Sequence, residues 1–237
     1  AVAQFHSVSD ATNAVSQIMR LGLSPAALEL LDSSTVQVVN RYKKLSLDEN
    51  PMLFIEFHGT SATGLKEELA WVKEICTENR SLRFDSGIGR EERNRLWEAR
   101  YGIREAIKTN NPGLSPLVID TAVPISKYPD MVEQGKRIVD KKGLKGYAFG
   151  HAGSGNLHME ILGKPGEKAQ WQLVEEAGEE IVRFALACDG TATGEHGIGI
   201  GKRKFMETEH GGSLALMKRI KNLLDPNGIM NPGKMFE

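Results

Sequence analysis

The segment that decides the fold is Gly146-Tyr147-Ala148-Phe149-Gly150-His151-Ala152-Gly153-Ser154-Gly155-Asn156-Leu157-His158-Met159-Glu160-Ile161-Leu162. Two strand-like stretches, 146–150 and 156–162, flank a short turn that contains glycines, which predicts a β-hairpin. Side chains alternate between the two faces of a strand, so His158 and Glu160 are expected on the same face. The hairpin predicts an antiparallel sheet, with His151 at its turn.

Helices and strands alternate on both sides of this hairpin. Helical spacing of apolar residues marks segments 10–21, 64–79, 90–110, 127–142, 167–188 and 213–224. Strand-like alternation marks the start of the chain and segments 52–58, 81–86 and 117–124. Ser24-Pro25 predicts the N-cap and first-turn proline of a further helix. Without an internal repeat or a low-complexity linker, the pattern predicts one compact α+β unit on an antiparallel sheet.

Composition narrows the classes of function. The chain has 237 residues, of which 40% are hydrophobic and 26% charged, as in an ordinary globular protein. Thirty basic and 31 acidic side chains give a net charge of −1 without a long block of like charge, so no nucleic-acid partner is expected.

The chain shows neither a long apolar run nor the pattern of a signal peptide. Cys76 and Cys188 lie on helical patterns, where buried, reduced thiols are expected. Because the chain begins with Ala1 in a strand-like segment, we expect it to be part of a longer protein.

Two glycine-rich segments gather histidines around a carboxylate. Segment 150–158 contains His151 and His158, and segment 193–202 contains Glu195 followed by His196. Two histidines and the Glu195 carboxylate leave positions on a divalent ion open for substrate oxygens, and zinc or manganese suits these ligands. The alternative is that each histidine caps a turn or is satisfied in the core.

Arg100 lies among apolar residues in the predicted 90–110 helix, on the face defined by Leu96, Ile103 and Ile107. A buried guanidinium must be paired or must meet a ligand, so Arg100 is suited to bind a substrate carboxylate. The alternatives are a place at the edge of the apolar stripe or an ion pair with Glu56 or Asp120. Arg104, one turn later, is expected to be a solvated surface charge.

Several motifs together resemble a known family. They are the two glycine-rich segments, Leu96-Trp97-Glu98-Ala99-Arg100, Val123-Pro124-Ile125-Ser126 and Asp225-Pro226-Asn227-Gly228-Ile229-Met230-Asn231-Pro232-Gly233-Lys234. Glu29-Leu30-Leu31-Asp32 and Phe54-Ile55-Glu56-Phe57-His58-Gly59 add to them. In this order the motifs resemble the C-terminal domain of FAD-linked oxidases, within which the D-lactate dehydrogenase (cytochrome) and glycolate oxidase subunit group is most similar.

The resemblance covers nearly all of residues 1–237 and implies a ferredoxin-like antiparallel sheet, with the N-terminal FAD-binding domain absent from this chain. It implies that a divalent metal is bound by His151, His158 and Glu195. It further implies roles for three other residues: His196 as the base beside the flavin, Arg100 as the ligand of the substrate carboxylate, and Asn231 near the flavin edge.

The chain departs from the family at three positions. Ser154 stands where the family commonly has aspartate, which puts the orientation of the metal-binding histidines in doubt. Val118 and Glu160 stand where some relatives have a lysine and an asparagine suited to a second carboxylate. A monocarboxylic 2-hydroxy acid such as D-lactate or glycolate is therefore favoured as the substrate.

The activity that the resemblance implies is oxidation of this acid to a 2-oxo acid by hydride transfer to FAD. Two alternatives stay open: a stand-alone metal-dependent hydrolase or lyase, and a catalytically inert fragment. The isolated chain is expected to be inactive, because half of the site would lie on the absent domain. The electron acceptor is left open, and a homodimer is considered. The expected location is cytoplasmic or membrane-peripheral in a bacterium and mitochondrial in a eukaryote.

Overall fold

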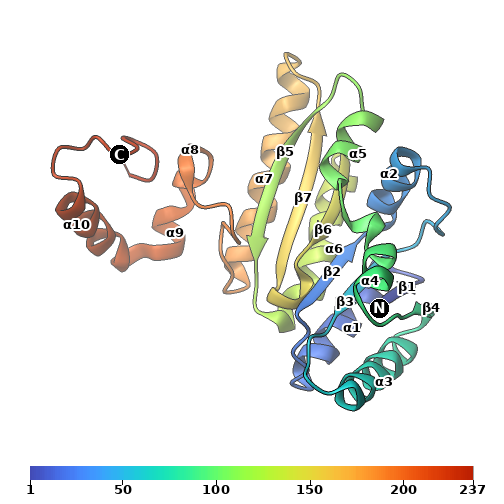
Figure 1. The fold of residues 1–237 in the computed structure, drawn as a ribbon. Coiled ribbons are helices and arrows are strands. Elements are labelled where there is room, and N and C mark those ends of the chain that lie inside the picture. The colour runs from blue at the N-terminus through green and yellow to red at the C-terminus, as the bar shows by residue number, and fades with distance from the viewer. Residues whose placement is uncertain (237) are drawn as a thin grey trace.

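A seven-stranded sheet runs through the structure, a computed structural model that describes residues 1–236 (Figure 1). The strands are β1 (Val2–Phe5), β2 (Ala27–Leu31), β3 (Met52–Glu56), β4 (Ser81–Asp85), β5 (Ser115–Ala122), β6 (Lys145–Gly150) and β7 (Asn156–Gly163). They lie in the order β4-β1-β3-β2-β6-β7-β5, and every neighbouring pair is antiparallel. The predicted α+β class with an antiparallel sheet is confirmed.

Helices cover both faces of the sheet. They are α1 (Val8–Arg20), α2 (Ser33–Lys43), α3 (Ala62–Glu78), α4 (Arg90–Leu96), α5 (Ile103–Asn110), α6 (Tyr128–Lys141), α7 (Lys168–Ala187), α8 (Gly199–Lys202), α9 (Met206–His210) and α10 (Leu214–Leu224). One core contains side chains of α1, α3, α6 and α7, and the other contains side chains of α2 and α5. The sheet is therefore the middle of three layers.

The connections explain why the sheet is ferredoxin-like. β1 and β2 are joined through α1 yet both pair with β3, and β3 and β4 are joined through α3 yet both pair with β1. In the other half, β5 and β6 are joined through α6 and both pair with β7. Each of these helices thus joins two strands that are separated in the sheet by a third strand. This arrangement is the split βαβ unit. The β6–β7 hairpin predicted from the sequence is present.

The prediction that Ser24-Pro25 begins a helix was wrong. Residues Ala27–Leu31 form strand β2, and the helix begins only at Ser33, where Asp32 Oδ1 accepts a hydrogen bond from the Thr35 amide. Leu30 packs into one core and Leu31 into the other. A strand buried on both faces shows no apolar and polar alternation, so its period cannot be recognised in the sequence.

The single helix predicted over 90–110 was also wrong. The chain forms α4, a short 3₁₀ turn (Glu98–Arg100) and then α5. Gly102, with φ of 74°, lies in the left-handed region that a continuous helix excludes. Arg100 therefore lies in a turn between two helices.

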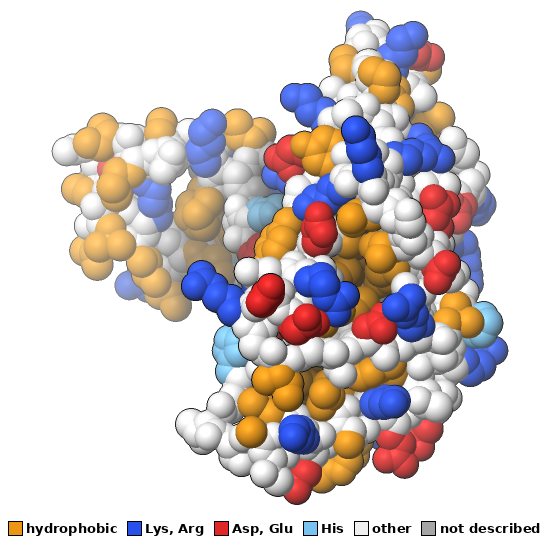
Figure 2. All heavy atoms as spheres, turned by 45° about the vertical axis from the view of Figure 1, so that its right-hand side comes forward, with side chains coloured by type: hydrophobic (Ala, Val, Ile, Leu, Met, Phe, Trp, Pro, Cys, Tyr) orange, Lys and Arg blue, Asp and Glu red, His pale blue; other side chains and the backbone are white. Residues whose placement is uncertain are grey.

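The chain leaves the sheet after α7. Helices α8 to α10 and the residues that follow them form a C-terminal arm that extends away from the sheet (Figure 1). The arm carries exposed apolar side chains, visible at the left of Figure 2. They include Ile200, Leu216, Leu223, Leu224 and Ile229. Within residues 1–236, no helix combines the length and apolar character needed to cross a membrane. Cys76 and Cys188 are both free; Cys76 is buried as predicted, whereas Cys188 is partly exposed.

Candidate active site

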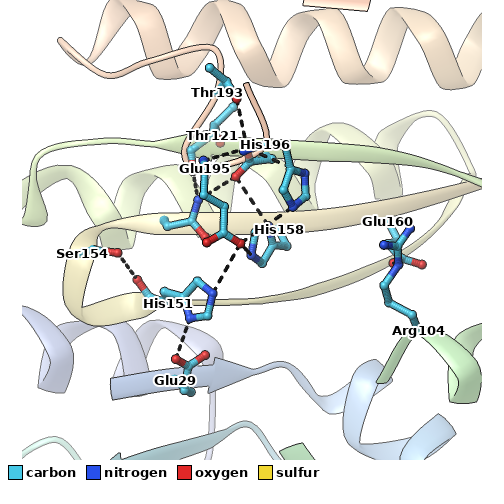
Figure 3. A network of polar contacts seen from close by, with 12 residues as sticks. Glu29, Arg104, Thr121, His151, Ser154, His158, Glu160, Thr193, Glu195 and His196 are labelled. Carbon is cyan, nitrogen blue, oxygen red and sulfur yellow. Dashed lines mark hydrogen bonds and ion pairs between the residues drawn. The ribbon is translucent and has the colours of Figure 1, made fainter. Parts of the chain in front are cut away.

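The hairpin and the loop between α7 and α8 bring together the three residues predicted as metal ligands (Figure 3). Glu195 Oε1 lies 3.5 Å from His151 Nε2 and 3.1 Å from His158 Nε2. The ligand atoms of the three residues all lie within 4.8 Å of one another. Two imidazoles and one carboxylate at these distances fit a zinc or manganese ion and leave coordination positions for a substrate.

Backbone geometry at the turn places His151. Its carbonyl oxygen accepts hydrogen bonds from the Ser154 amide at 3.1 Å, the Asn156 amide at 3.2 Å and the Ser154 hydroxyl at 3.0 Å. Gly155 has φ of 70°, and a Cβ atom there would lie 2.0 Å from the Val123 carbonyl oxygen. Glycine is therefore required where the turn approaches β5.

A second carboxylate lies behind each of the two histidines. His151 Nδ1 is 2.6 Å from Glu29 Oε1, and His158 Nδ1 faces Asp120 Oδ1 at 3.6 Å. Carboxylates on the outer ring nitrogen orient metal-binding histidines and make them better ligands. Glu29 is placed to orient the ring of His151, whereas Nδ1 of His158 is buried without a hydrogen-bond partner and faces Asp120 only at ion-pair distance.

These contacts and burial shift the pKa values of the histidines and of Glu29. The hydrogen bond to Glu29 raises the pKa of His151 above its ordinary value. Burial raises the pKa of Glu29, but the hydrogen bond from His151 and the charge of Arg100 outweigh it, so that the pKa is below its ordinary value. Burial lowers the pKa of His158. A neutral His158 is the form that binds a metal.

Asp120 holds the loop that carries Glu195 and His196. The Asp120 side chain is completely buried, and its Oδ2 atom accepts hydrogen bonds from the Glu195 amide at 3.0 Å and the His196 amide at 2.9 Å. Its Oδ1 atom accepts one from Asn156 Nδ2 at 2.8 Å, and Lys202 Nζ donates to its carbonyl oxygen at 2.8 Å. Burial raises the pKa of Asp120, but these donors outweigh it and bring the pKa below its ordinary value.

His196, the predicted base, lies at the edge of the cluster with 45% of its side chain exposed. Its ring stacks on that of His158, with centroids 5.2 Å apart and planes 9° apart. A second possible ligand set consists of Asp120, His158 and His196. Backbone amides already occupy Oδ2 of Asp120, so the set with Glu195 is the better metal site.

Arg100 forms an ion pair, but not with Glu56 or Asp120, the partners considered in the alternative interpretation. Its Nε and Nη2 atoms donate to Glu29 Oε2 at 3.0 and 2.8 Å, whereas Glu56 pairs with Arg93. The Arg100 side chain is 19% exposed and lines the same pocket as the histidines. Its remaining donors can meet a substrate carboxylate there.

One pocket of about 310 Å³ connects these groups, and its lining includes Arg100, Arg104, Phe149, His158, Glu160 and His196. The prediction for Arg104 was wrong in part, because its exposed guanidinium lies over the pocket with Nε 3.3 Å from Glu160 Oε1. Burial raises the pKa of Glu160. Asn231 is exposed on the C-terminal arm and is not among the residues that line this pocket, so a place near a flavin stays a prediction.

Glu29 and Asp120 were not predicted from the sequence as site residues. Each is a single acidic residue inside a strand of otherwise mainly apolar side chains, and both are buried. A buried carboxylate needs a partner, so this pattern was a usable signal.

A possible metal set, a carboxylate-binding arginine and an accessible imidazole around one small pocket are typical of metal-assisted enzymes that act on small acids. The sequence matches the family model "FAD linked oxidases, C-terminal domain" over residues 1–235. The chain belongs to this family.

Three curated relatives are similar to the chain over all or nearly all of its length. A probable mitochondrial D-lactate dehydrogenase of Danio rerio is 38% identical, covering 100% of this chain and 48% of the relative. A mitochondrial D-lactate dehydrogenase [cytochrome] of Arabidopsis thaliana is 36% identical, covering 100% and 42%. Glycolate oxidase subunit GlcD of Bacillus subtilis is 32% identical, covering 99% and 50%. The chain thus spans about half the length of these relatives.

Solved structures share the fold. The 4-ethylphenol oxidase of Gulosibacter chungangensis, in complex with isoeugenol, has a TM-score of 0.71 at 15% identity, covering 99% of this chain and 53% of that one. A p-cresol methylhydroxylase with substrate bound has a TM-score of 0.61 at 12% identity, covering 100% and 52%. At these identities the likeness establishes the fold alone.

Proposed function

We propose that this chain is the substrate- and metal-binding domain of a flavin-dependent 2-hydroxy-acid dehydrogenase or oxidase of the D-lactate or glycolate type. One observation carries the proposal: His151, His158 and Glu195 converge at the pocket that Arg100 also lines, in a member of the FAD-linked oxidase family. The names of the relatives, D-lactate dehydrogenases and a glycolate oxidase subunit, support the same substrate class.

Arg100 binds the carboxylate of the acid. Glu29 holds the guanidinium along its Nε and Nη2 edge, which leaves Nη1 and the second proton of Nη2 for the substrate. This anchoring fixes the C2 carbon relative to the histidines, so a large part of the rate comes from orientation.

His151, His158 and Glu195 are the residues that would hold a divalent ion at the pocket. Such an ion would supply a Lewis acid that lowers the pKa of the substrate hydroxyl. His196 takes the hydroxyl proton, since its ring is accessible and lies beside the ring of His158. The C2 hydrogen leaves as a hydride, so the acid loses two electrons and two hydrogens and becomes the 2-oxo acid. FAD, held mostly by another part of the protein, supplies the hydride acceptor.

The exposed apolar side chains of the arm favour packing against a partner domain. Apolar side chains such as Leu223, with 80% exposure, and Ile229, with 77%, are costly to leave in water when they cluster. We propose that the FAD-binding half of the protein packs against this arm and brings the flavin to the pocket. Because the two D-lactate dehydrogenases named above are mitochondrial, a eukaryotic source would place this protein in mitochondria.

The test is anaerobic mixing of the flavin-containing protein with D-lactate and with glycolate. Loss of the oxidised flavin absorbance is expected, together with inhibition by a chelator and recovery with zinc or manganese. His196→Ala should retain metal and flavin yet reduce flavin at least 10³-fold more slowly, roughly the scale of general-base catalysis. The exposed His6→Ala variant is the matched control.

Rapid flavin reduction by His196→Ala would remove the role of His196. Turnover of an ester or hydroxy acid by residues 1–237 without flavin would instead support a stand-alone hydrolase or lyase. Absence of both metal and turnover in the flavin-containing protein would contradict the proposal.

A further inference from the structure

The pocket continues beyond the histidines along β7. Glu160 follows His158 on the same face of that strand, two residues further on, which is about 7 Å along an extended chain. In the sheet, Glu160 lies opposite Val118 on β5 and Tyr147 on β6. If the carboxylate is held by Arg100 and the C2 oxygen lies at the histidines, as proposed above, this second row is where the substrate side chain lies.

Glu160 is a buried carboxylate with an unsatisfied oxygen. Its side chain is 2% exposed, and its Oε1 atom has no hydrogen-bond partner among the described residues. Arg104 Nε is 3.3 Å from that atom, close enough for an ion pair but without hydrogen-bond geometry. A buried acceptor without a donor is unfavourable, so a donor supplied by a ligand would be bound selectively.

Charged side chains of both signs lie at this end of the pocket. Figure 3 shows Arg104 and Glu160 facing each other, apart from the group formed by His151, His158 and Glu195. Of the other side chains nearby, Val118 and Ile103 are apolar, whereas Glu105 adds another carboxylate whose charge acts on Glu160. Arg104 is 65% exposed and can shift to admit a small group. A second carboxylate there would face Glu160, whereas a hydroxyl could donate to Glu160 and accept from Arg104.

We propose that Glu160 and Arg104 form the subsite for the substrate side chain and select 2-hydroxy acids that carry a second hydroxyl on C3. The smallest substrate of this class is D-glycerate. The subsite accepts short aliphatic side chains less well, because they leave Glu160 without a donor, and it rejects dicarboxylates by repulsion from Glu160. The inference rests on the proposed function, because that function sets the direction in which the substrate lies.

The test compares kcat/KM of the flavin-containing protein for D-glycerate, D-lactate and D-malate. The wild type is expected to prefer D-glycerate over D-lactate by about 10-fold or more, the scale of one hydrogen bond to a charged group. Two variants separate the acceptor from the charge. Glu160→Gln keeps an acceptor oxygen but removes the charge, and Glu160→Leu removes both.

Glu160→Gln should keep the preference for D-glycerate and raise kcat/KM for D-malate at least about 10-fold, because Arg104 is then free to bind the second carboxylate. Glu160→Leu should lose the preference for D-glycerate and also gain D-malate. Its kcat/KM for D-lactate should rise, because the methyl group then no longer leaves a buried carboxylate without a donor. The flavin content and the urea unfolding midpoint of the variant serve as the control for folding.

Equal or better use of D-lactate than D-glycerate by the wild type overturns the inference, and so does unchanged D-malate use in Glu160→Gln. In both cases reduction by D-lactate leaves the proposed function intact. If neither glycolate nor any of the three acids reduces the flavin of the wild type, the proposed function itself fails and the subsite fails with it.

Discussion

Glu29 Oε2 accepts two hydrogen bonds from the guanidinium of Arg100, at 3.0 Å from Nε and 2.8 Å from Nη2. The other oxygen of this carboxylate lies 2.6 Å from Nδ1 of His151. One buried side chain therefore holds both the arginine proposed to bind the substrate and a histidine proposed to bind the metal. Metal binding and substrate binding should consequently change together when Glu29 is altered.

The substitution Glu29→Gln tests this coupling. The amide keeps the size of the side chain but removes the charge and one of the two acceptor oxygens. Metal affinity should fall about 10- to 100-fold, as is usual when the carboxylate behind a metal-binding histidine is lost. In the same variant KM for the hydroxy acid should rise, because Arg100 is no longer held in place.

Titration with Mn²⁺ or Co²⁺ and steady-state kinetics measure the two effects. Glu133→Gln, on the exposed surface of α6, is the control for loss of a carboxylate and should change neither value. A rise in KM at unchanged metal affinity would show that Glu29 does not support His151.

Asp120 should make stability depend on pH in a defined direction. Its pKa in the folded protein lies below the unfolded value of about 3.9, so its contribution is fully present above that value. The contribution is lost as the pH falls through the folded pKa. Asp120→Asn leaves the hydrogen-bonded loop with a neutral and partly mismatched acceptor, which should cost about 3 kcal/mol at pH 7.

Urea unfolding of the protein after removal of metal with a chelator measures this cost in the free energy of unfolding. The difference between wild type and Asp120→Asn should shrink when the measurement is repeated at pH 3, because Asp120 is then protonated in the unfolded wild type while it is still charged in the folded protein. Asp140→Asn, at an exposed position of α6, should show a small difference that changes little over this range. An Asp120→Asn difference that grows toward pH 3 would contradict the assignment.

Local patterns were sufficient to predict the hairpin and much of the helical framework. The turn at 150–156 depends on glycines that are close in sequence, and the alternation along β7 reports one strand at a time. Strand β2 could not be recognised, since Leu30 and Leu31 are both buried and a strand with two buried faces resembles a short buried helix.

The limit of local sequence patterns also decides which parts of the site could be predicted. His151, His158 and Glu195 could be predicted because glycines mark their loops, but the partner of Arg100 could not. Arg100 and Glu29 are 71 residues apart and meet because Ala99 and Ile103, on either side of Arg100, pack in the same core as Leu31 of β2. This packing is a property of the whole chain, so the ion pairs that follow from it are not visible in local patterns.

Burial should protect one of the two thiols. Cys76 is completely buried in the core beside Val72 and Ile75, and burial raises its pKa to about 12. At pH 8 it is therefore protonated as well as covered, and only its thiolate would react. Ellman's reagent should modify at most the partly exposed Cys188 of the native protein and both thiols after unfolding. Rapid modification of both thiols in the native protein would show that this core opens.

Gly194 lies where the loop that carries Glu195 contacts the buried side chains of Asn156 and Asp120. A Cβ atom at this position would lie 1.9 Å from Nδ2 of Asn156 and 2.7 Å from Oδ1 of Asp120. Both side chains are buried and hydrogen-bonded to each other, so they cannot move without loss of those bonds. Gly194→Ala should displace the loop that carries Glu195.

We expect Gly194→Ala to lower metal affinity at least about 10-fold and to destabilise the protein by about 2 kcal/mol, the scale of overpacking in a buried site. Gly201→Ala is the matched control, because its added methyl group meets nothing within 4 Å and it lies in helix α8, where alanine is tolerated well. Metal titration and urea unfolding of the two variants make the comparison. Equal metal affinity in both would mean that the loop does not depend on the Asn156 and Asp120 contact to place Glu195.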